Sequence, residues 1–265
     1  MEEENLLPAN TSTFIHCISG ALAGIAEHSL VFPIDTIKTR QQVLFTLPTK
    51  HSLWNGVQSI IIGAGPAHAL QFSVYEYLKT TISPTFAAAI ATISSEAFQT
   101  PFDVIKQRMQ VHNYSTIREC AAKVYEREGL RAFYISYPVS LSITVPFNMI
   151  HFSIYEMLKP KLLNWRNTSN EYDPTVICLG GGIAGGIASI LTNPLDLLKT
   201  TLQTRGEMNP SMSKMDSVDI LRKAYKQNGI KTFFRGALPR VATHIPSTAI
   251  VWSVYEYIKF AMQNF

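Results

Sequence analysis

A six-residue phrase occurs three times in this 265-residue chain, each time at the end of a long stretch that is almost free of charge. The phrase reads Pro-x-Asp-x-x-Lys and occupies residues 33–38, 101–106 and 194–199. A second phrase, Tyr-Glu-x-x-Lys, follows each copy downstream at residues 75–79, 155–159 and 255–259. Regular internal repetition indicates a fold that is built from equivalent units. The sequence therefore predicts three copies of one helical hairpin, each with charged residues at both ends.

Charged residues make up only 16% of the chain, whereas they make up about 25% of an average soluble domain. They are also segregated, because no Asp, Glu, Lys or Arg occurs in residues 5–26, 51–75, 80–95, 132–155, 175–193 or 241–255. A helix that crosses a bilayer needs about 20 mostly apolar residues. A soluble all-helical protein is the alternative, but residues 176–191 lack the polar stripe that a soluble helix carries.

The expected fold is therefore an all-α membrane protein with six transmembrane helices, arranged as three pseudo-symmetric hairpins. The predicted spans are residues 12–39, 57–82, 85–108, 137–162, 174–201 and 239–262. The three hairpins occupy residues 1–83, where the connecting loop is short, 84–165 and 166–265. Loops 109–136 and 202–238 carry apolar residues at helical spacing, which predicts a short amphipathic helix on one membrane face in each loop. The residues that set this spacing are Ile117, Cys120, Ala121, Val124 and Tyr125, and Val218, Ile220, Leu221 and Ala224.

Small residues and prolines recur at matching positions of the three repeats. Small residues four apart allow membrane helices to approach closely, and they predict close packing at Gly20, Gly24, Gly181 and Gly185. Proline inside a membrane helix removes one backbone hydrogen bond and permits a kink. Kinks are therefore predicted at Pro33, Pro66, Pro101, Pro146, Pro194 and Pro246.

The repeated charges predict two rings. Asp and Lys inside a membrane span are costly unless they are paired, and each Asp can pair with the Lys three residues later or with a Lys of a neighbouring helix. The first ring would contain Asp35, Lys38, Asp103, Lys106, Asp196 and Lys199, and the second Tyr75, Glu76, Lys79, Tyr155, Glu156, Lys159, Tyr255, Glu256 and Lys259. Two rings that cannot both be closed would give alternating access to a central cavity. The alternative is that these charges only anchor the helices at the membrane surface.

These phrases resemble the signature of the mitochondrial carrier family, Pro-x-[Asp/Glu]-x-x-[Lys/Arg]-x-[Lys/Arg] followed by an aromatic-basic-Gly element. Residues 33–40 match the signature in full, and the second element is intact at residues 234–236. The resemblance covers nearly the whole chain. It implies a multi-pass protein of the inner mitochondrial membrane, with both termini toward the intermembrane space. It also places the Asp–Lys ring on the matrix side and the Tyr-Glu-x-x-Lys ring on the cytoplasmic side, as two gates.

The resemblance identifies Gln41 as a brace for the matrix-side gate, with Met109 and Leu202 at the same position of the other repeats. The first repeat departs from the family pattern, because only 13 residues separate Arg40 from Trp54. The matrix-side helix that family members carry there is expected to be missing or reduced to the loop at residues 42–53.

Within the family, residues 26–29 and 63–69 resemble the mitoferrins, the mitochondrial iron carriers, and residues 133–138 and 245–250 fit the fungal branch. This resemblance implies import of ferrous iron as a transported substrate, with no permanently bound cofactor. Imidazole and carboxylate ligands suit Fe(II). The expected transient contacts are His28, His68, Glu96, His244, Asn148, Thr144 and Glu27. Each histidine can instead be a helix-to-helix hydrogen-bonding residue, Glu96 a structural partner of a polar neighbour, and His244 a capping or packing residue.

Two other functions remain open from the sequence. A carrier of an organic substrate, such as a nucleotide, a cofactor or a cation like S-adenosylmethionine, is the first. An anionic substrate would need basic residues at the centre of the cavity, and apart from the rings the spans offer almost none; Arg240 lies near the end of the sixth span. A non-transporting receptor or scaffold on the same fold is the second, and it would be expected to lose the rings.

An enzyme is not expected, because no Gly-x-Ser-x-Gly, His-Glu-x-x-His or phosphate-binding glycine loop occurs. The net charge of +4 is too small to indicate nucleic acid, and Cys17, Cys120 and Cys178 are too scattered for a disulfide framework or a zinc site. The acidic residues 2–4 are unlike a transit peptide, so targeting is expected to be internal. The expected partners are membrane lipid and the transported ion, and the expected functional unit is a monomer.

Overall fold

The computed structural model describes residues 13–44, 52–168, 173–207 and 215–263, and every regular element in these ranges is helical. The long helices are α1 (Thr13–Gln42), α2 (Val57–Leu78), α3 (Pro84–Val111), α5 (Tyr137–Arg166), α6 (Pro174–Thr204) and α9 (Ala237–Gln263). Each begins and ends within a few residues of a span predicted from the sequence. Two shorter helices, α4 (Ile117–Glu128) and α8 (Ser217–Asn228), lie where amphipathic helices were predicted.

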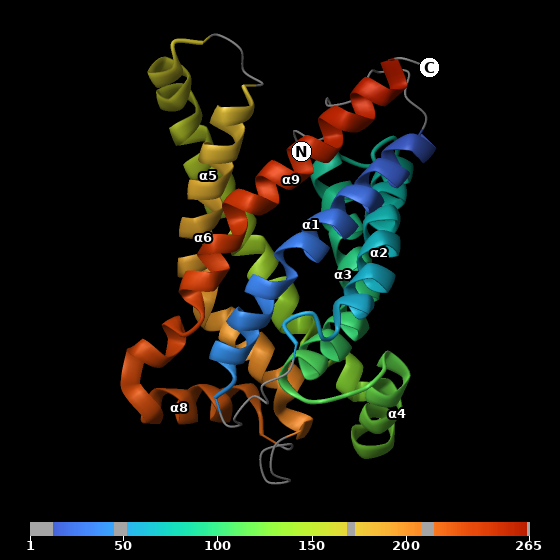
Figure 1. The fold of residues 1–265 in the computed structure, drawn as a ribbon, viewed down its shortest axis with the longest axis vertical. Coiled ribbons are helices and arrows are strands. Elements are labelled where there is room, and N and C mark those ends of the chain that lie inside the picture. The colour runs from blue at the N-terminus through green and yellow to red at the C-terminus, as the bar shows by residue number, and fades with distance from the viewer. Residues whose placement is uncertain (1–12, 45–51, 169–172, 208–214, 264–265) are drawn as a thin grey trace.

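The long helices pack side by side in a closed order around the molecule. Helix α1 contacts α2 and α9, α2 contacts α3, α5 contacts α6, and α6 contacts α9. Among neighbouring long helices in this order, α3 and α5 have the least extensive packing against each other. We call their boundary the seam between α3 and α5. Figure 1 shows α5 and α6 diverging from α1, α2 and α3 toward the upper end, while α4 and α8 lie at the lower end.

The long helices expose apolar side chains and bury polar ones. Large apolar residues are more than one-third exposed on each of these helices, for example Leu30, Ile62, Phe86, Met149, Leu191 and Leu238. Thr36, Gln42, Asn193 and Thr200 are completely buried. Apolar surface of this extent indicates an apolar environment around the protein. By length and composition alone, α6 is the one described helix that meets the criterion for crossing a membrane, since charged and polar residues lower the mean hydropathy of the others.

Small residues bring the helices into close contact. A Cβ atom at Gly182 would lie 2.3 Å from Ile245 Cγ1, and one at Gly63 would lie 2.7 Å from the Phe102 ring. Every long helix has a proline in its interior, at Pro33, Pro66, Pro101, Pro146, Pro194 and Pro246. Gly20 lies in α1, but its contacts are outside the described side chains.

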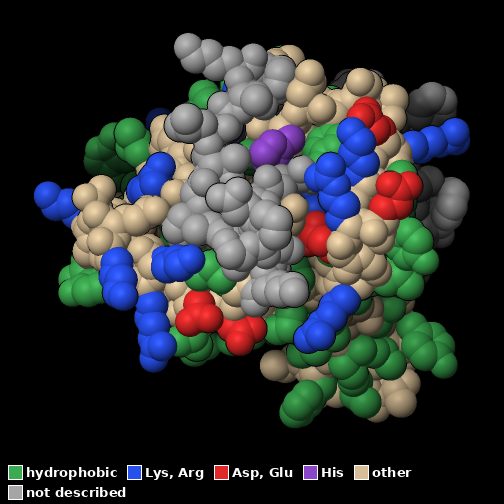
Figure 2. Space-filling view, turned by 90° about the horizontal axis from the view of Figure 1, so that it is seen from below, with side chains coloured by type: hydrophobic (Ala, Val, Ile, Leu, Met, Phe, Trp, Pro, Cys, Tyr) green, Lys and Arg blue, Asp and Glu red, His purple; other side chains and the backbone are tan. Residues whose placement is uncertain are grey.

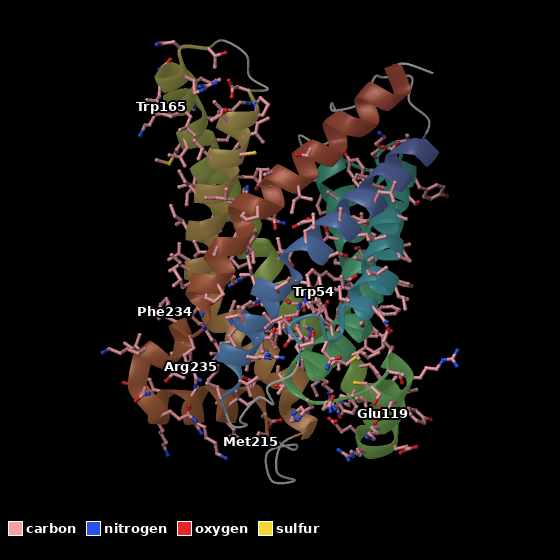
Figure 3. The ribbon with its side chains drawn as sticks, viewed as in Figure 1. Trp54, Glu119, Trp165, Met215, Phe234 and Arg235 are labelled. Carbon is pink, nitrogen blue, oxygen red and sulfur yellow. The ribbon has the colours of Figure 1, made fainter. Side chains whose placement is uncertain are left out.

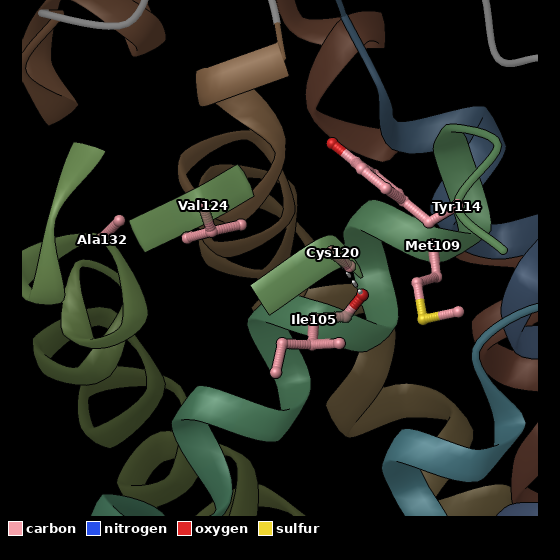
Figure 4. Packing of buried hydrophobic residues seen from close by; sticks show 6 residues of the cluster. All are labelled: Ile105, Met109, Tyr114, Cys120, Val124 and Ala132. Carbon is pink, nitrogen blue, oxygen red and sulfur yellow. Dashed lines mark hydrogen bonds between the residues drawn. The ribbon is translucent and has the colours of Figure 1, made fainter. Parts of the chain in front are cut away.

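The two short helices pack their apolar faces on the lower ends of α3 and α6. Helix α4 buries Cys120 and Val124 against Ile105 and Met109 of α3, as Figure 4 shows. Helix α8 buries Ile220 beside Leu198 and Leu202 of α6. Two residues of the predicted apolar faces, Tyr125 and Val218, are instead exposed. Figure 2 shows this end of the molecule from below, with Lys and Arg side chains distributed around its rim.

The short first repeat has no counterpart of α4 or α8 in its described residues. Residues 45–51 lie outside the description, so the predicted loop at 42–53 is seen only at its ends. The later end is tied directly to α1: Thr36 Oγ1 donates to the Leu53 carbonyl at 2.7 Å, and Arg40 Nη2 donates to the Ser52 carbonyl at 3.2 Å. The Trp54 ring stacks on Phe32 at 6.4 Å between centroids, beside the lower part of α1 in Figure 3.

Candidate functional site

Three ion pairs join the first helices of the three repeats, α1, α3 and α6, near their lower ends. Measured from Nζ to Oδ2, the pairs are Lys38–Asp196 at 2.8 Å, Lys106–Asp35 at 2.7 Å and Lys199–Asp103 at 3.0 Å. Each helix gives its Asp to one neighbour and its Lys to the other, so the pairs close a ring. We call this set the ion-pair ring. Because the charges are largely buried, pairing is needed to offset the cost of removing them from water.

The ring is braced by glutamine, but one residue later than predicted. Gln41 is exposed, whereas Gln42 is fully buried and donates from Nε2 to Asp196 Oδ2 at 2.8 Å. Gln42 in turn accepts a hydrogen bond from Thr200 Oγ1 at 2.7 Å. The prediction of Gln41 was one residue early. Adjacent helix residues point about 100° apart, so Gln41 faces outward while Gln42 reaches Asp196.

The same register holds in the other repeats. Gln110, four residues after Lys106, donates to Asp35 Oδ2 at 3.1 Å. Gln203, four residues after Lys199, is also buried but donates to Ser136 Oγ at 2.8 Å rather than to the ring. Met109 and Leu202 therefore do not hold the brace position. The signal that identifies the braces is a Gln four residues after each repeated Lys.

One further basic residue joins the ring from α9. Arg240 is 9% exposed, its Nε lies 3.7 Å from Asp196 Oδ2, and its Nη1 donates to the Ser189 carbonyl at 2.9 Å. No role in the ring was predicted for Arg240 from the sequence. The sequence feature that could have identified it is its isolation: no other Lys or Arg lies between Arg235 and Lys259.

The upper ends of the hairpins are joined differently. Tyr75 and Tyr155 are buried, and Lys79 pairs with Glu76 of its own helix at 2.6 Å. Glu156 is exposed and Lys159 is half-buried on α5. The side chains of Tyr255, Glu256 and Lys259 lie outside the described part of the chain. The Lys79–Glu76 ion pair thus lies within one helix, whereas the ion pairs of the ion-pair ring join different helices.

A second level of polar residues lies two turns above the ring. His28, Glu96 and Ser189 each precede a ring Asp by seven residues, which places them on the same helix face about 10 Å higher. Each meets a polar residue from the second helix of its own hairpin. The pairs are His28 with His68, Glu96 with Thr144, and Ser189 with His244. We call these three pairs the polar layer.

The first pair of the polar layer consists of two stacked imidazoles. The ring centroids of His28 on α1 and His68 on α2 are 6.1 Å apart, with 28° between the ring planes. Gly24 makes room for this arrangement, since a Cβ there would lie 2.3 Å from His68 Cδ2. The Glu27 carboxylate lies close enough to interact electrostatically with His68. The two imidazoles are thus in contact, with the Glu27 carboxylate within electrostatic range rather than in the same cluster.

The second pair places a carboxylate above a ring lysine. Glu96 on α3 is half-buried and interacts with the Thr144 hydroxyl on α5. It is also within electrostatic range of Lys199 and Asp103, the ring pair below it. This carboxylate connects the polar layer to the ion-pair ring.

The third pair shows His244 in the packing role that was the alternative to a metal contact. His244 Nε2 is hydrogen-bonded to Ser189 Oγ, and the ring stacks on Phe147 at 5.6 Å. A Cβ atom at Gly185 would lie 2.8 Å from His244 Nδ1, so the imidazole lies against the α6 backbone. Arg240 and Lys38 also place positive charge near it. The side chain acts here as a packing and hydrogen-bonding link between α9 and α6, which the sequence analysis had left as an alternative.

No permanent metal centre is present in the described residues: no three His, Cys, Asp or Glu side chains lie together in a group that would hold a metal ion. Asn148, another predicted contact, is exposed on α5. The site therefore offers the pair His28 and His68 with Glu27 on one side and Glu96 with Thr144 on another. Such partial ligand sets suit brief contacts with a cation better than stable coordination.

Comparison with known proteins agrees with the repeat structure. The profile of the family described as "Mitochondrial carrier protein" matches residues 9–51, 80–165 and 170–265. An uncharacterized mitochondrial carrier of Schizosaccharomyces pombe is 40% identical over 280 residues, which cover 94% of this chain and 91% of the relative.

Two named relatives are similarly full-length. Mitochondrial RNA-splicing protein MRS4 of Saccharomyces cerevisiae is 38% identical over 292 residues, covering 97% of this chain and 95% of the relative. Mitoferrin-1 of Rattus norvegicus is 35% identical over 296 residues, covering 98% of this chain and 86% of the relative.

Proposed function

The chain belongs to the mitochondrial carrier family, and on that premise we propose that it carries ferrous iron into the mitochondrial matrix. Membership makes it a membrane-embedded transporter of a small solute in the inner mitochondrial membrane, and not an enzyme. The proposal of iron is supported by its similarity to mitoferrins and by the ligands of the polar layer. The single observation that carries it is the stacked pair His28 and His68 beside Glu27.

The charge of the site favours a cation. The three pairs of the ion-pair ring cancel, and Glu27 and Glu96 outnumber Arg240, which leaves one net negative charge when the histidines are neutral. Imidazole nitrogens and carboxylate oxygens are ligands that suit Fe(II). Few ligands and weak contacts allow a transported ion to leave again.

The ion-pair ring acts as the matrix-side gate in this proposal, and the Tyr-Glu-x-x-Lys phrases form the cytoplasmic-side gate. The ring is closed here, and α5 and α6 diverge from α1, α2 and α3 at the other end (Figure 1). In this proposal the closed ring corresponds to the state that is open toward the intermembrane space. All six long helices cross the membrane, both termini lie on the intermembrane-space side, and one chain is the transporting unit.

Iron entering from the intermembrane space would contact His28, His68 and Glu27 first or together with Glu96. The bound ion favours the conformation in which the ring breaks, and the cavity then opens to the matrix. A ligand drives such a change only by binding one conformation better than the other. Closure of the upper gate behind the ion would complete alternating access.

A carrier of an organic anion is the second candidate, and Arg240 is its only support in the cavity. Arg240 is already held by Asp196 and by the Ser189 carbonyl. An anion would have to displace both. A receptor or scaffold without transport would have no use for three complete ring pairs.

Uptake by proteoliposomes that contain the purified protein tests the proposal. Fe(II), kept reduced, should enter protein-containing vesicles faster than empty vesicles. Exchange of nucleotides and of S-adenosylmethionine, measured on the same preparation, should match empty vesicles. Brisk exchange of an organic substrate with no Fe(II) uptake would overturn the iron proposal and leave family membership intact.

A further inference from the structure

Lys199 is the only lysine of the ion-pair ring whose partner has a second carboxylate directly above it. Glu96 precedes Asp103 by seven residues on α3 and so lies about 10 Å higher on the same face. Gln99 lies between them and donates from Nε2 to Asp103 Oδ1 at 3.3 Å. The corresponding positions of the other repeats hold His28 and Ser189, which carry no carboxylate.

Lys199 therefore interacts with two carboxylates on α3. It pairs with Asp103 at 3.0 Å and is also attracted by Glu96. Glu96 in turn repels Asp103, which weakens the closed pair. Lys199 has another possible partner on its own helix, Asp196, but that carboxylate already binds Lys38 and Arg240.

The position of this pair favours movement. Glu96 and Thr144 face each other across the seam between α3 and α5, which is the thinnest junction between neighbouring long helices. Regions with few packed contacts open at lower free energy than the rest of a structure. The Lys199–Asp103 pair joins α3 to α6, so its carboxylate lies on the helix that borders this seam.

We propose that Lys199 passes from Asp103 to Glu96 when the ring opens, and that its ammonium group then displaces the transported cation from Glu96. This inference rests on the proposed cation transport. An unpaired lysine inside a membrane span is costly, and Glu96 supplies the replacement partner. Two positive charges cannot share one carboxylate without strong repulsion. Gate opening and cargo release thus become one event.

Binding of Mn(II), a redox-stable probe, to purified Lys199→Gln tests the displacement. Without the competing ammonium, the Kd should fall about tenfold, as expected for one unit charge about 10 Å away at an effective dielectric constant of about 20. Lys106→Gln is the comparison, because its partner Asp35 has His28 rather than a carboxylate seven residues before it. Its Kd should fall by less than that of Lys199→Gln. The double variant Lys199→Gln/Glu96→Gln should lose the gain in affinity.

Equal Kd values for Lys199→Gln and Lys106→Gln would overturn the inference.

Transport kinetics provide a second test that does not depend on the Lys199 variant folding. Glu96→Gln should lower the maximal rate of Fe(II) uptake even at saturating iron, because Lys199 has lost its second partner. Glu27→Gln, the control, should act mainly on the half-saturating concentration. A full maximal rate for Glu96→Gln also overturns the inference. Absence of Mn(II) and Fe(II) binding to the wild-type protein would instead overturn the iron function and the inference together.

Discussion

The ammonium group of Lys38 on α1 lies 2.8 Å from the carboxylate of Asp196 on α6. That carboxylate also receives Gln42 Nε2 at 2.8 Å and lies 3.7 Å from Arg240 Nε. The Lys199–Asp103 pair has only a longer contact from Gln99, at 3.3 Å, as additional support. The three pairs are thus equivalent in sequence but unequal in their surroundings, and the α1–α6 side of the ring is the most strongly held.

Charge reversal should show that ring partners lie on different helices. Asp103→Lys and Lys199→Asp should each reduce uptake at least about tenfold, because an unpaired buried charge costs about 3–5 kcal/mol. The double variant should regain part of the uptake, since it restores the pair with reversed polarity. Uptake by proteoliposomes at equal protein incorporation measures all three.

The control for this experiment is a reversal within one helix. Asp103→Lys combined with Lys106→Asp reverses two charges of the same repeat, but Lys106 pairs with Asp35 of α1. This combination should not regain uptake. If it recovers as well as the Asp103 and Lys199 double variant, the inter-helix ring is the wrong description.

Gln42 and Gln41 form a natural pair for testing the brace. Gln42→Ala removes the hydrogen bonds to Asp196 and from Thr200, each of which should cost about 1–3 kcal/mol in a buried site. Gln41→Ala changes an exposed side chain and should have little effect. Thermal unfolding in detergent should show a lower Tm for Gln42→Ala alone, and equal shifts would argue against the brace.

Much of the fold could be predicted because it depends on sequence patterns within single segments. Charge-free stretches of spanning length set the long helices, and the repeated Asp and Lys residues indicated the ring before any packing was known. The amphipathic spacing around Cys120 and Ile220 located α4 and α8. These predictions depend on helix periodicity and on the cost of burying charge, which act within one segment.

The missed features depend on how different helices meet. The link from His244 to Ser189 needs α9 to approach α6 closely at Gly185, and the role of Arg240 depends on the same packing. Neither contact follows from the spacing within one repeat. The brace was predicted one residue early, at Gln41, because the family signature does not show which of two adjacent glutamines faces Asp196.

Gly24 should be required for the position of His68. In Gly24→Ala the new methyl group would lie 2.3 Å from His68 Cδ2, so the imidazole must move away from His28. A displacement of about 1 Å can lower a rate about 100-fold when geometry is critical, and we expect uptake to fall at least about tenfold. Gly186→Ala is the control, since its methyl group would meet only Val241 Cγ1, at the longer distance of 3.2 Å.

Uptake of Fe(II) by Gly24→Ala and Gly186→Ala vesicles makes the comparison, with Tm values checked in parallel. A normal rate for Gly24→Ala would show that the stacked arrangement of His28 and His68 is not needed for transport.

Arg108 should be essential for holding α4 against the bundle. Its side chain is fully buried, it pairs with Glu128 at the end of α4, and its Nε donates to the Gln203 carbonyl at 3.0 Å. Arg108→Gln leaves the Glu128 carboxylate without this partner and should cost about 3–5 kcal/mol. Arg118→Gln, which changes an exposed residue of α4, is the control. Thermal unfolding measures both, and equal Tm values would contradict the structural role.

The most direct test of the central claim is Fe(II) uptake by proteoliposomes that contain the wild-type protein, His28→Ala or His68→Ala. The account predicts rapid uptake by the wild type and a loss of at least about tenfold in each variant, at unchanged Tm, because each variant removes one of the two stacked imidazoles. Wild-type uptake no faster than that of empty vesicles, or undiminished uptake by both variants, would contradict it.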